Sequence, residues 1–296
     1  MTTSTFTLPC PVGFSPRAAA SFYAGFAPLE QAQSGDDGLT LAFRTDGDFE
    51  AVGVQLSARG RSLHVEVEGK ASQPALTTQL GRMLGLDADG EEWLARGRAD
   101  PLLGALQARF PGFFTAGFPS PYEAGVSGVL SHRSSIAQAA RVRRALSERH
   151  GDFVGGRWVM PSPRQLLAVK SFPGVAAQKL EVLHGLARAA LDGFLDAERL
   201  RALPAELAME QLQQLRGIGP WTAGHLLLRG ASLRDVLPET EPRVLLAYEH
   251  HAGRRVTAEE FREAAQAWRP FRTWAAILLV RTHFASGAER RARVAA

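Results

Sequence analysis

The residue types most suggestive of chemistry lie in one short segment, LRGIGPWTAGHLLLRG (215–230), in which two glycines and a proline directly precede an apolar helix. Gly217 and Gly219 are free to adopt backbone conformations closed to other residues, and Pro220 suits the first position of a helix because no N–H is needed there. The backbone N–H groups of residues 217–221 would then point outward at the positive end of the helix, where an anion such as phosphate is stabilised. The alternative is an ordinary helical hairpin with a glycine-rich turn.

A helix on each side of this turn gives the helix-hairpin-helix pattern, at about residues 207–229. Such a hairpin holds the DNA backbone without reading the base sequence, since phosphate contacts position a protein on the duplex. From about Glu91 onward the other segments also predict helices joined by short links, with N-terminal caps expected at Ser162 and Thr257. We therefore expect an all-helical domain over residues 91–296.

The first ninety residues show a different pattern. Apolar and polar residues alternate in the segments 38–45, 50–60 and 62–69, which predicts strands, and residues 73–86 have the pattern of a helix. The predicted fold class is α+β: a small antiparallel-sheet α+β domain over residues 1–90, followed by the all-α helix-hairpin-helix domain.

Composition limits the class of protein. The 296 residues, 45% of them hydrophobic, suffice for two domains with a sizeable core. No apolar run reaches the roughly 18 residues of a transmembrane helix, and the N-terminus lacks the pattern of a signal peptide, so we expect a cytoplasmic protein without membrane contact. The single Cys10 excludes an internal disulfide, and eight histidines without an H-x-x-x-H pair predict no metal site. The net charge of +4 permits nucleic-acid binding without arguing for it.

Nearly the whole chain resembles the DNA-3-methyladenine glycosylase II family of the helix-hairpin-helix glycosylase superfamily. The matching blocks, in the family's order, are RADPLLGALQARFPGF (98–113), SPYEAGVSGVLSHRSSIAQA (120–139), MPSPRQLLAV (160–169), GVAAQKLEVLHGLARAALDG (174–193), LRGIGPWTAGHLLLRGASLRDVLPETE (215–241) and WRPFRTWAAILL (268–279). The strand-rich first third also fits, because this family carries an N-terminal α+β domain.

This resemblance implies a monofunctional DNA glycosylase that acts in base excision repair. The expected partner is double-stranded DNA, from which an alkylated base of the 3-methyladenine or 7-methylguanine type is flipped out and cleaved off. We expect little release of neutral hypoxanthine, a monomeric protein and no required cofactor, although backbone carbonyls between Gln213 and Ile218 could hold a structural monovalent cation. The alternatives are a non-catalytic DNA-damage-binding protein of the same fold and a helical scaffold without a DNA role.

The resemblance also indicates which carboxylate acts. Counting from the shared Trp-Thr-Ala without a gap, the family's catalytic aspartate corresponds to Glu241, one methylene longer. Asp235 and Glu239 are the other candidates on the same loop. The alternative for Glu241 is a solvated carboxylate that caps the helix beginning at Pro242.

The expected base-binding residues follow the hairpin. Bifunctional relatives place a Schiff-base lysine where this chain has Trp221, so we expect a base-only reaction, with the indole offered to a cationic base. His225, one turn later, falls where relatives often carry an aromatic residue. The alternatives are a packed core tryptophan and a hydrogen-bonded helix histidine.

Two residues replace those that usually fill the gap left by the flipped nucleotide. They are His132 and Arg133, and Arg133 would be a charged wedge or, alternatively, a surface arginine on a phosphate. Val280 stands where some relatives place a pocket tryptophan, which implies a wider pocket. The residues expected to contact DNA are therefore His132, Arg133, Gly217, Ile218, Gly219 and Pro220. Those expected to serve the core and its ion pairs are Trp268, Arg272 and Trp274.

Overall fold

The computed structural model describes residues 3–24, 33–35, 38–115 and 117–295. Five antiparallel strands form one sheet in the order β1-β5-β4-β3-β2. The strands are β1 (Thr3–Pro9), β2 (Gln33–Gly35), β3 (Gly38–Arg44), β4 (Ala51–Arg59) and β5 (Ser62–Glu68). The predicted strands are thus confirmed as β3, β4 and β5, whereas β1 and β2 were not predicted.

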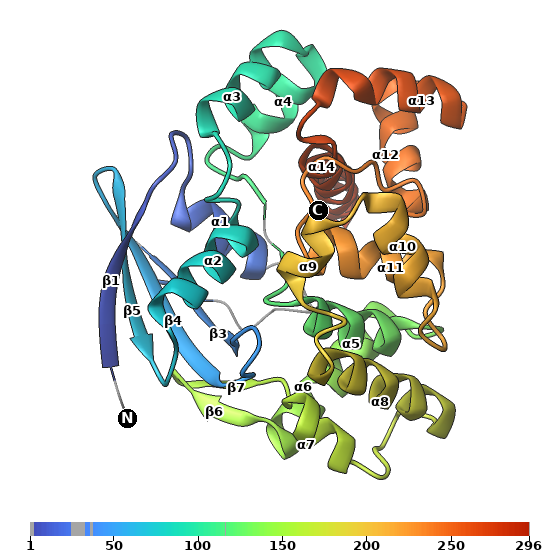
Figure 1. The fold of residues 1–296 in the computed structure, drawn as a ribbon. Coiled ribbons are helices and arrows are strands. Elements are labelled where there is room, and N and C mark those ends of the chain that lie inside the picture. Colours follow the sequence, from blue (N-terminus) through green and yellow to red (C-terminus); the bar gives the residue numbers. More distant parts are fainter. Residues whose placement is uncertain (1–2, 25–32, 36–37, 116, 296) are drawn as a thin grey trace.

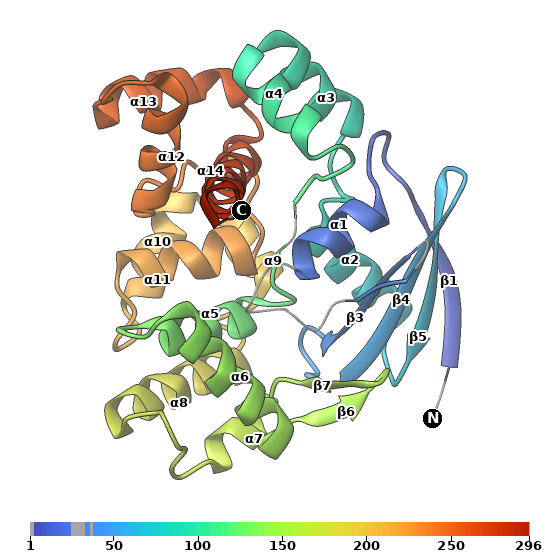
Figure 2. The same cartoon turned by 180° about the vertical axis from the view of Figure 1, so that it is seen from behind.

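Alternation along the central strands explains the sheet. In register across β3, β4 and β5 lie Leu41, Val54 and Val67, and all three side chains are buried. On the other face Thr40, Gln55 and Glu66 lie in register and are intermediate or exposed, as expected of a sheet with one face on the core. Helices α1 (Pro16–Ala24) and α2 (Gln73–Leu84) cover that face (Figures 1 and 2).

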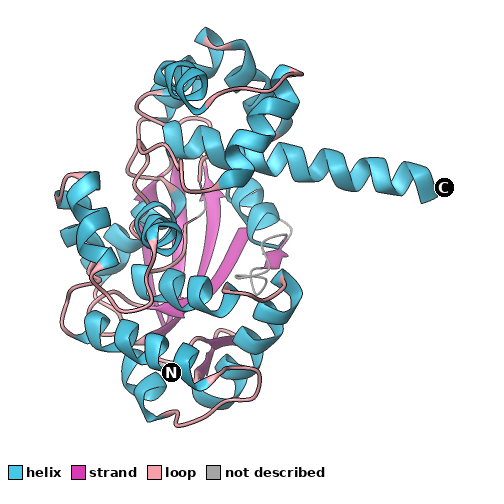
Figure 3. Ribbon diagram, turned by 90° about the vertical axis from the view of Figure 1, so that its right-hand side faces the viewer, coloured by secondary structure: helices cyan, strands magenta, loops and turns pink. Residues whose placement is uncertain are grey.

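The rest of the chain is mostly helical. Its helices are α3 (Gly90–Ala99), α4 (Pro101–Arg109), α5 (Pro121–Ser131), α6 (Ile136–His150), α7 (Pro163–Ala168), α8 (Ala177–Leu191), α9 (Ala197–Ala202), α10 (Ala205–Gln213), α11 (Pro220–His225), the π-helical η2 (Leu226–Gly230), α12 (Pro242–Ala252), α13 (Ala258–Ala264), the 3₁₀ helix η3 (Ala265–Trp268) and α14 (Arg272–Ala295). Ser162 and Thr257 are the predicted N-caps, and both form capping boxes, of which only the one at Thr257 was predicted. The far end of α14 projects from the body of the protein (Figure 3).

The expectation that strands vanish after Glu91 is wrong in one place. A two-stranded hairpin is formed by β6 (Asp152–Val154) and β7 (Arg157–Val159). Each strand has only three residues, too few to show alternation in the sequence. Its turn, Gly155-Gly156, contacts the first sheet so closely that a Cβ on Gly53 of β4 would lie 2.8 Å from the Cα of Gly155.

The hydrophobic core does not divide at residue 90. One cluster joins the first sheet to the C-terminal helices, and Trp93, Phe271 and Trp274 meet in it with ring centroids 5.0–5.4 Å apart. A second cluster fills the centre of α5, α8 and η2. The domain boundary at residue 90 therefore stays a prediction.

No helix within the described residues is long and apolar enough to cross a membrane.

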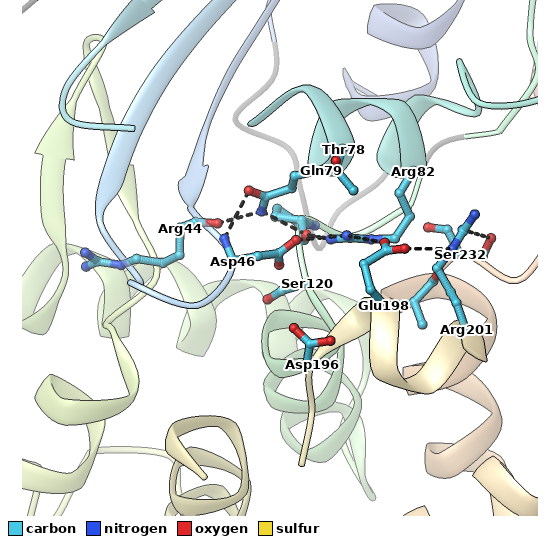
Figure 4. Close-up of polar contacts among 12 residues, drawn as sticks. Arg44, Asp46, Thr78, Gln79, Arg82, Ser120, Asp196, Glu198, Arg201 and Ser232 are labelled. Atoms are coloured by element: carbon cyan, nitrogen blue, oxygen red, sulfur yellow. Dashed lines mark hydrogen bonds and ion pairs between the residues drawn. The ribbon is translucent and has the colours of Figure 1, made fainter. Parts of the chain in front are cut away.

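A polar network also fixes the first region against the helices (Figure 4). The Arg82 side chain of α2 is almost fully buried, and its guanidinium lies 2.8 Å from an Asp46 carboxylate oxygen. It donates to the Pro119 carbonyl at 2.7 Å and reaches Glu198 of α9 at 3.4 Å. Since a buried guanidinium must be paired, these contacts hold α2 and α9 in one relative position.

Candidate active site

The hairpin has the predicted form, with α10 and α11 on either side of the turn. Gly217 has a φ of +81°, and a Cβ there would lie 2.4 Å from a methyl group of Val182, so only glycine fits. Gly219 differs from expectation: its φ is −89°, extended backbone, and a Cβ there would meet nothing within 4 Å. Between them Ile218 is buried and anchors the turn.

The hairpin exposes only part of the predicted set of backbone donors, because the N–H of Ile218 donates to the Leu215 carbonyl at 3.0 Å. Gly219 is the N-cap of α11 and Pro220 is its first residue. Within the described chain, the N–H groups of Gly219, Trp221 and Thr222 donate no hydrogen bond, and intrahelical bonding begins with Ala223, which donates to the Gly219 carbonyl at 2.9 Å. Three outward N–H groups at the positive end of a helix can bind an anion.

A cavity of about 500 Å³ opens beside the hairpin. Its walls are α11 with η2, α14, the adjoining parts of α5 and α6, and the loop that ends at Glu241. The residues that line it include Phe22, Arg143, Trp221, His225, Arg229, Thr273, Glu241, Arg243, Val280 and Arg281. The structure thus brings together Trp221, His225, Glu241 and Val280 as the sequence predicted.

Trp221 and His225 form one flat surface in this cavity. Their rings are stacked, 5.2 Å apart between centroids and 6° from parallel. Burial, together with the positive charges of Arg229 and Arg243, lowers the pKa of His225 to about 3, while Glu241 opposes the shift. His225 is therefore neutral at physiological pH, and Trp221 is half-buried at the cavity rather than packed in the core.

Glu241 both lines the cavity and caps a helix, so its catalytic role stays a prediction. Its carboxylate lines the cavity and accepts a hydrogen bond from the Trp221 indole Nε1 at 3.1 Å. It also caps α12, accepting from the backbone N–H of Arg243 at 3.1 Å. Burial raises the pKa of the carboxyl, but the hydrogen bonds from Arg243 and Trp221 outweigh burial and hold it below its ordinary value. Glu241 is therefore ionised at neutral pH.

Arg243 was not predicted. Its Nε and Nη2 atoms lie 2.6 and 2.5 Å from the two carboxylate oxygens of Glu241, a bidentate pair. The only signal in the sequence is an arginine two residues after a helix-capping glutamate. This pair holds the carboxylate in one orientation and partly neutralises its charge.

The other two candidate carboxylates lie elsewhere. Asp235 is bound by Arg272 at 2.9 Å and by Arg269 at 3.0 Å. Glu239 is paired with Arg262 on the surface. Neither lines the cavity. Arg272 therefore serves an ion pair, and Trp268 and Trp274 are both buried in the core, as expected for all three.

The turn between α5 and α6 carries Arg133 in an unusual backbone conformation. Arg133 is exposed and has a φ of +50°, which is strained for a residue with a Cβ. The Lys179 ammonium holds this turn by donating to the carbonyls of Leu130 and His132 at 3.2 and 2.8 Å and to the Ser134 hydroxyl at 3.3 Å.

His132 braces the same turn against the hairpin. Its Nε2 lies 2.8 Å from the Thr222 hydroxyl, and burial followed by the charge of Lys179 lowers its pKa. The side chain of His132 is thus engaged within the protein, and a DNA contact by it stays a prediction.

Among the described residues no group of three His, Cys, Asp or Glu side chains could hold a metal ion.

Comparisons with known proteins agree with the geometry. No family model matches the chain. DNA-3-methyladenine glycosylase 2 of Escherichia coli is 34% identical over 186 residues, covering 58% of this chain and 61% of that protein. The DNA-3-methyladenine glycosylase of Bacillus subtilis is 28% identical over 210 residues, covering 66% of this chain and 68% of that protein. The matched segment thus spans less than two thirds of the E. coli protein.

Solved structures show the same fold. The 3-methyladenine DNA glycosylase of Archaeoglobus fulgidus superposes with a TM-score of 0.74 at 21% identity, covering 93% of this chain and 97% of that one. Schizosaccharomyces pombe Mag1, solved with abasic DNA, gives a TM-score of 0.51 at 23% identity and covers 65% of this chain. At these identities the likeness is evidence of fold alone.

Proposed function

Since the chain belongs to the DNA-3-methyladenine glycosylase II family of the helix-hairpin-helix superfamily, we propose that it is a monofunctional DNA glycosylase that removes alkylated bases in base excision repair. The observation that carries this function is the cavity in which an ionised carboxylate, that of Glu241, lies beside the stacked rings of Trp221 and His225. The rings offer a surface for a flipped base, and the carboxylate lies where the sugar would enter.

The reaction follows from this arrangement. The glycosidic C1′–N bond breaks, and its electron pair leaves with the base. The sugar becomes positively charged, and the fixed carboxylate of Glu241 stabilises that charge. Water then adds to C1′ and gives up a proton, which leaves an abasic site and the free base. Arg243 acts as a positioning residue, because it fixes both oxygens of the carboxylate.

A base-only reaction is supported by the lysines. The chain has three, Lys70, Lys170 and Lys179, and none of them lines the described cavity. Lys179 donates three hydrogen bonds to the turn that carries Arg133. Without an amine at the sugar no Schiff base can form. Borohydride should therefore trap no covalent adduct with DNA.

Two further features are proposed on the same basis. The carbonyl groups of Gln213, Arg216 and Ile218 accept no backbone hydrogen bond within the described chain, so they suit a structural monovalent cation. We also propose a cytoplasmic monomer, which light scattering during gel filtration would test. A chain that elutes as a dimer without DNA would contradict the monomer.

Base release from methylated duplex DNA is the decisive experiment. Free base appearing in proportion to enzyme supports the glycosylase. Tight binding of the damaged duplex without release supports a damage-binding protein of the same fold. No salt-dependent affinity for any duplex would instead support a scaffold without a DNA role.

A further inference from the structure

Helix α5 joins the two elements that are expected to meet DNA. It packs against α11, which begins at the hairpin (Figures 1 and 2). Its C-cap is His132, and Arg133 follows directly. The face of α5 toward α11 carries Gly128 and, about one turn later, His132. A Cβ on Gly128 would lie only 3.4 Å from the methyl group of Thr222, so the two helices approach closely at this point.

A hydrogen bond between side chains links the two elements. The Nε2 atom of His132 and the hydroxyl of Thr222 share it, at a distance of 2.8 Å. Thr222 is buried, and within the described part of the chain its hydroxyl makes no other hydrogen bond. Because a buried hydroxyl is rarely left without a partner, this bond fixes the place of His132 relative to α11.

Helix α8 supports the same two elements. Lys179 donates to the carbonyls of His132 and Leu130 at 2.8 and 3.2 Å. About one turn later on α8 is Val182, whose methyl group would lie 2.4 Å from a Cβ on Gly217 of the hairpin. The hairpin and the turn after α5 therefore rest on one helix and are joined to each other through His132.

Arg133 depends on this junction for its conformation. Its φ of +50° is unfavourable for a residue with a Cβ and persists only where surrounding contacts fix the backbone. Those contacts fall on its two neighbours: on the ring and the carbonyl of His132, and on the hydroxyl of Ser134. A shift of α11 against α5 would therefore displace Arg133.

We propose that His132 is a positioning residue that couples the binding of a phosphate by the hairpin to the place at which Arg133 enters the duplex. This inference rests on the proposed glycosylase function and gives His132 a role other than the DNA contact expected from the sequence. The connection runs through Thr222, whose backbone N–H is one of the outward donors of the hairpin and whose hydroxyl bonds to His132. A phosphate on those donors fixes α11 and, through this hydroxyl, the turn.

The surroundings of His132 favour this role over a direct contact with DNA. Burial, followed by the charge of Lys179, lowers the pKa of His132, so the ring is neutral at neutral pH and adds no positive charge for a phosphate. A direct contact through Nε2 would also require the ring to leave Thr222, whose buried hydroxyl would then lose its partner.

A double-mutant cycle between the two partners tests the coupling. Thr222→Val removes the hydroxyl at nearly constant shape, and His132→Leu removes the ring nitrogen. Each single variant should lower single-turnover base release from a paired 7-methylguanine lesion by about three- to tenfold, as for the loss of one hydrogen bond. The loss should be much smaller for the same lesion in a bulge, where flipping costs less. The double variant should lose no more than the weaker of the two single variants.

Two further variants complete the experiment. His132→Gln offers an amide in place of the ring and should retain much of the release from the paired lesion. Thr78→Val removes a hydroxyl that donates to the Pro74 carbonyl on α2, and it should change release from neither lesion.

Three results would overturn the coupling. They are single losses that multiply in the double variant, which would make His132 a direct DNA contact, equal losses on the paired and bulged lesions, and wild-type release in both single variants. In each case release of 7-methylguanine by wild type would leave the proposed function standing. Binding of both duplexes by wild type without any release would instead overturn the proposed function itself.

Discussion

At the scale of single residues, Glu241 carries the greatest weight because it is the only carboxylate that lines the cavity within the described chain. Glu241→Gln keeps the size and the helix cap but removes the charge that stabilises the sugar. Base release should therefore fall on the order of 10²-fold or more, with affinity for damaged DNA retained. Glu241→Asp, the matched control, should keep most of the activity. Wild-type rates in the Gln variant would show that the carboxylate takes no part in the reaction.

The pH dependence of base release depends on Arg243. Burial raises the pKa of Glu241, but hydrogen bonds from Arg243 bring it below its ordinary value. Since only the ionised form acts, release should persist as pH falls through the usual glutamate range and be lost only below it. Arg243→Met removes these hydrogen bonds, so the acidic limb should move to higher pH. Single-turnover rates of base release across this pH range, corrected for spontaneous depurination, measure the shift. If wild type and Arg243→Met lose activity at the same acidic pH, the loss reports the protonation of a group other than Glu241.

At the scale of elements, the two hairpin glycines have different requirements. Gly219 has extended backbone and open space around its Cβ position, so Gly219→Ala should fold and bind DNA almost as wild type does. Gly219→Asp adds a negative charge beside the outward N–H groups. It should weaken binding of damaged and undamaged duplex alike, by about tenfold or more, through repulsion of phosphate.

Stability measurements provide the control for this hairpin. Aspartate is a favourable N-cap, so Gly219→Asp should not lower the free energy of unfolding. Gly217→Ala should lower it by about 1–3 kcal/mol, because of the positive φ and the contact with Val182. If DNA affinity is the same in wild type and Gly219→Asp, the hairpin does not face the duplex.

The turn between α5 and α6 is a second element with a testable role. Arg133 is held in strained backbone by the three hydrogen bonds of Lys179, which suits a side chain that must enter the duplex at a fixed place. Arg133→Ala should reduce base release more on a paired lesion than on a bulged one, where flipping costs less. Lys179→Met should show the same preference with a smaller loss. Equal losses on both duplexes would make Arg133 an ordinary phosphate contact.

At the scale of the whole molecule, the sequence predicts contacts that are local and misses those that are not. Strands β3 to β5 and the hairpin were predictable because alternation and glycine spacing act over a few residues. The three-residue strands β6 and β7 gave too short a pattern. The site shows the same limit. Trp221 and Glu241 follow from spacing. In contrast, Arg281 lies over the rings of Phe22 and Phe110 only because the fold brings together segments that are far apart in the chain.

The last prediction concerns how the first region is held against the helices. Arg82→Met leaves the Asp46 carboxylate largely buried without its partner, which should lower the free energy of unfolding at neutral pH by about 3 kcal/mol. The unpaired Asp46 should then have a higher pKa than in wild type, so protonation stabilises the folded variant and the deficit narrows as pH falls. Denaturant unfolding at neutral and mildly acidic pH measures both effects. Arg201→Met, which removes a more exposed partner of Asp87, should cost about 1 kcal/mol or less. A deficit that is equally small in both variants, or that widens in acid, would mean that the Arg82 pair does not hold the two parts together.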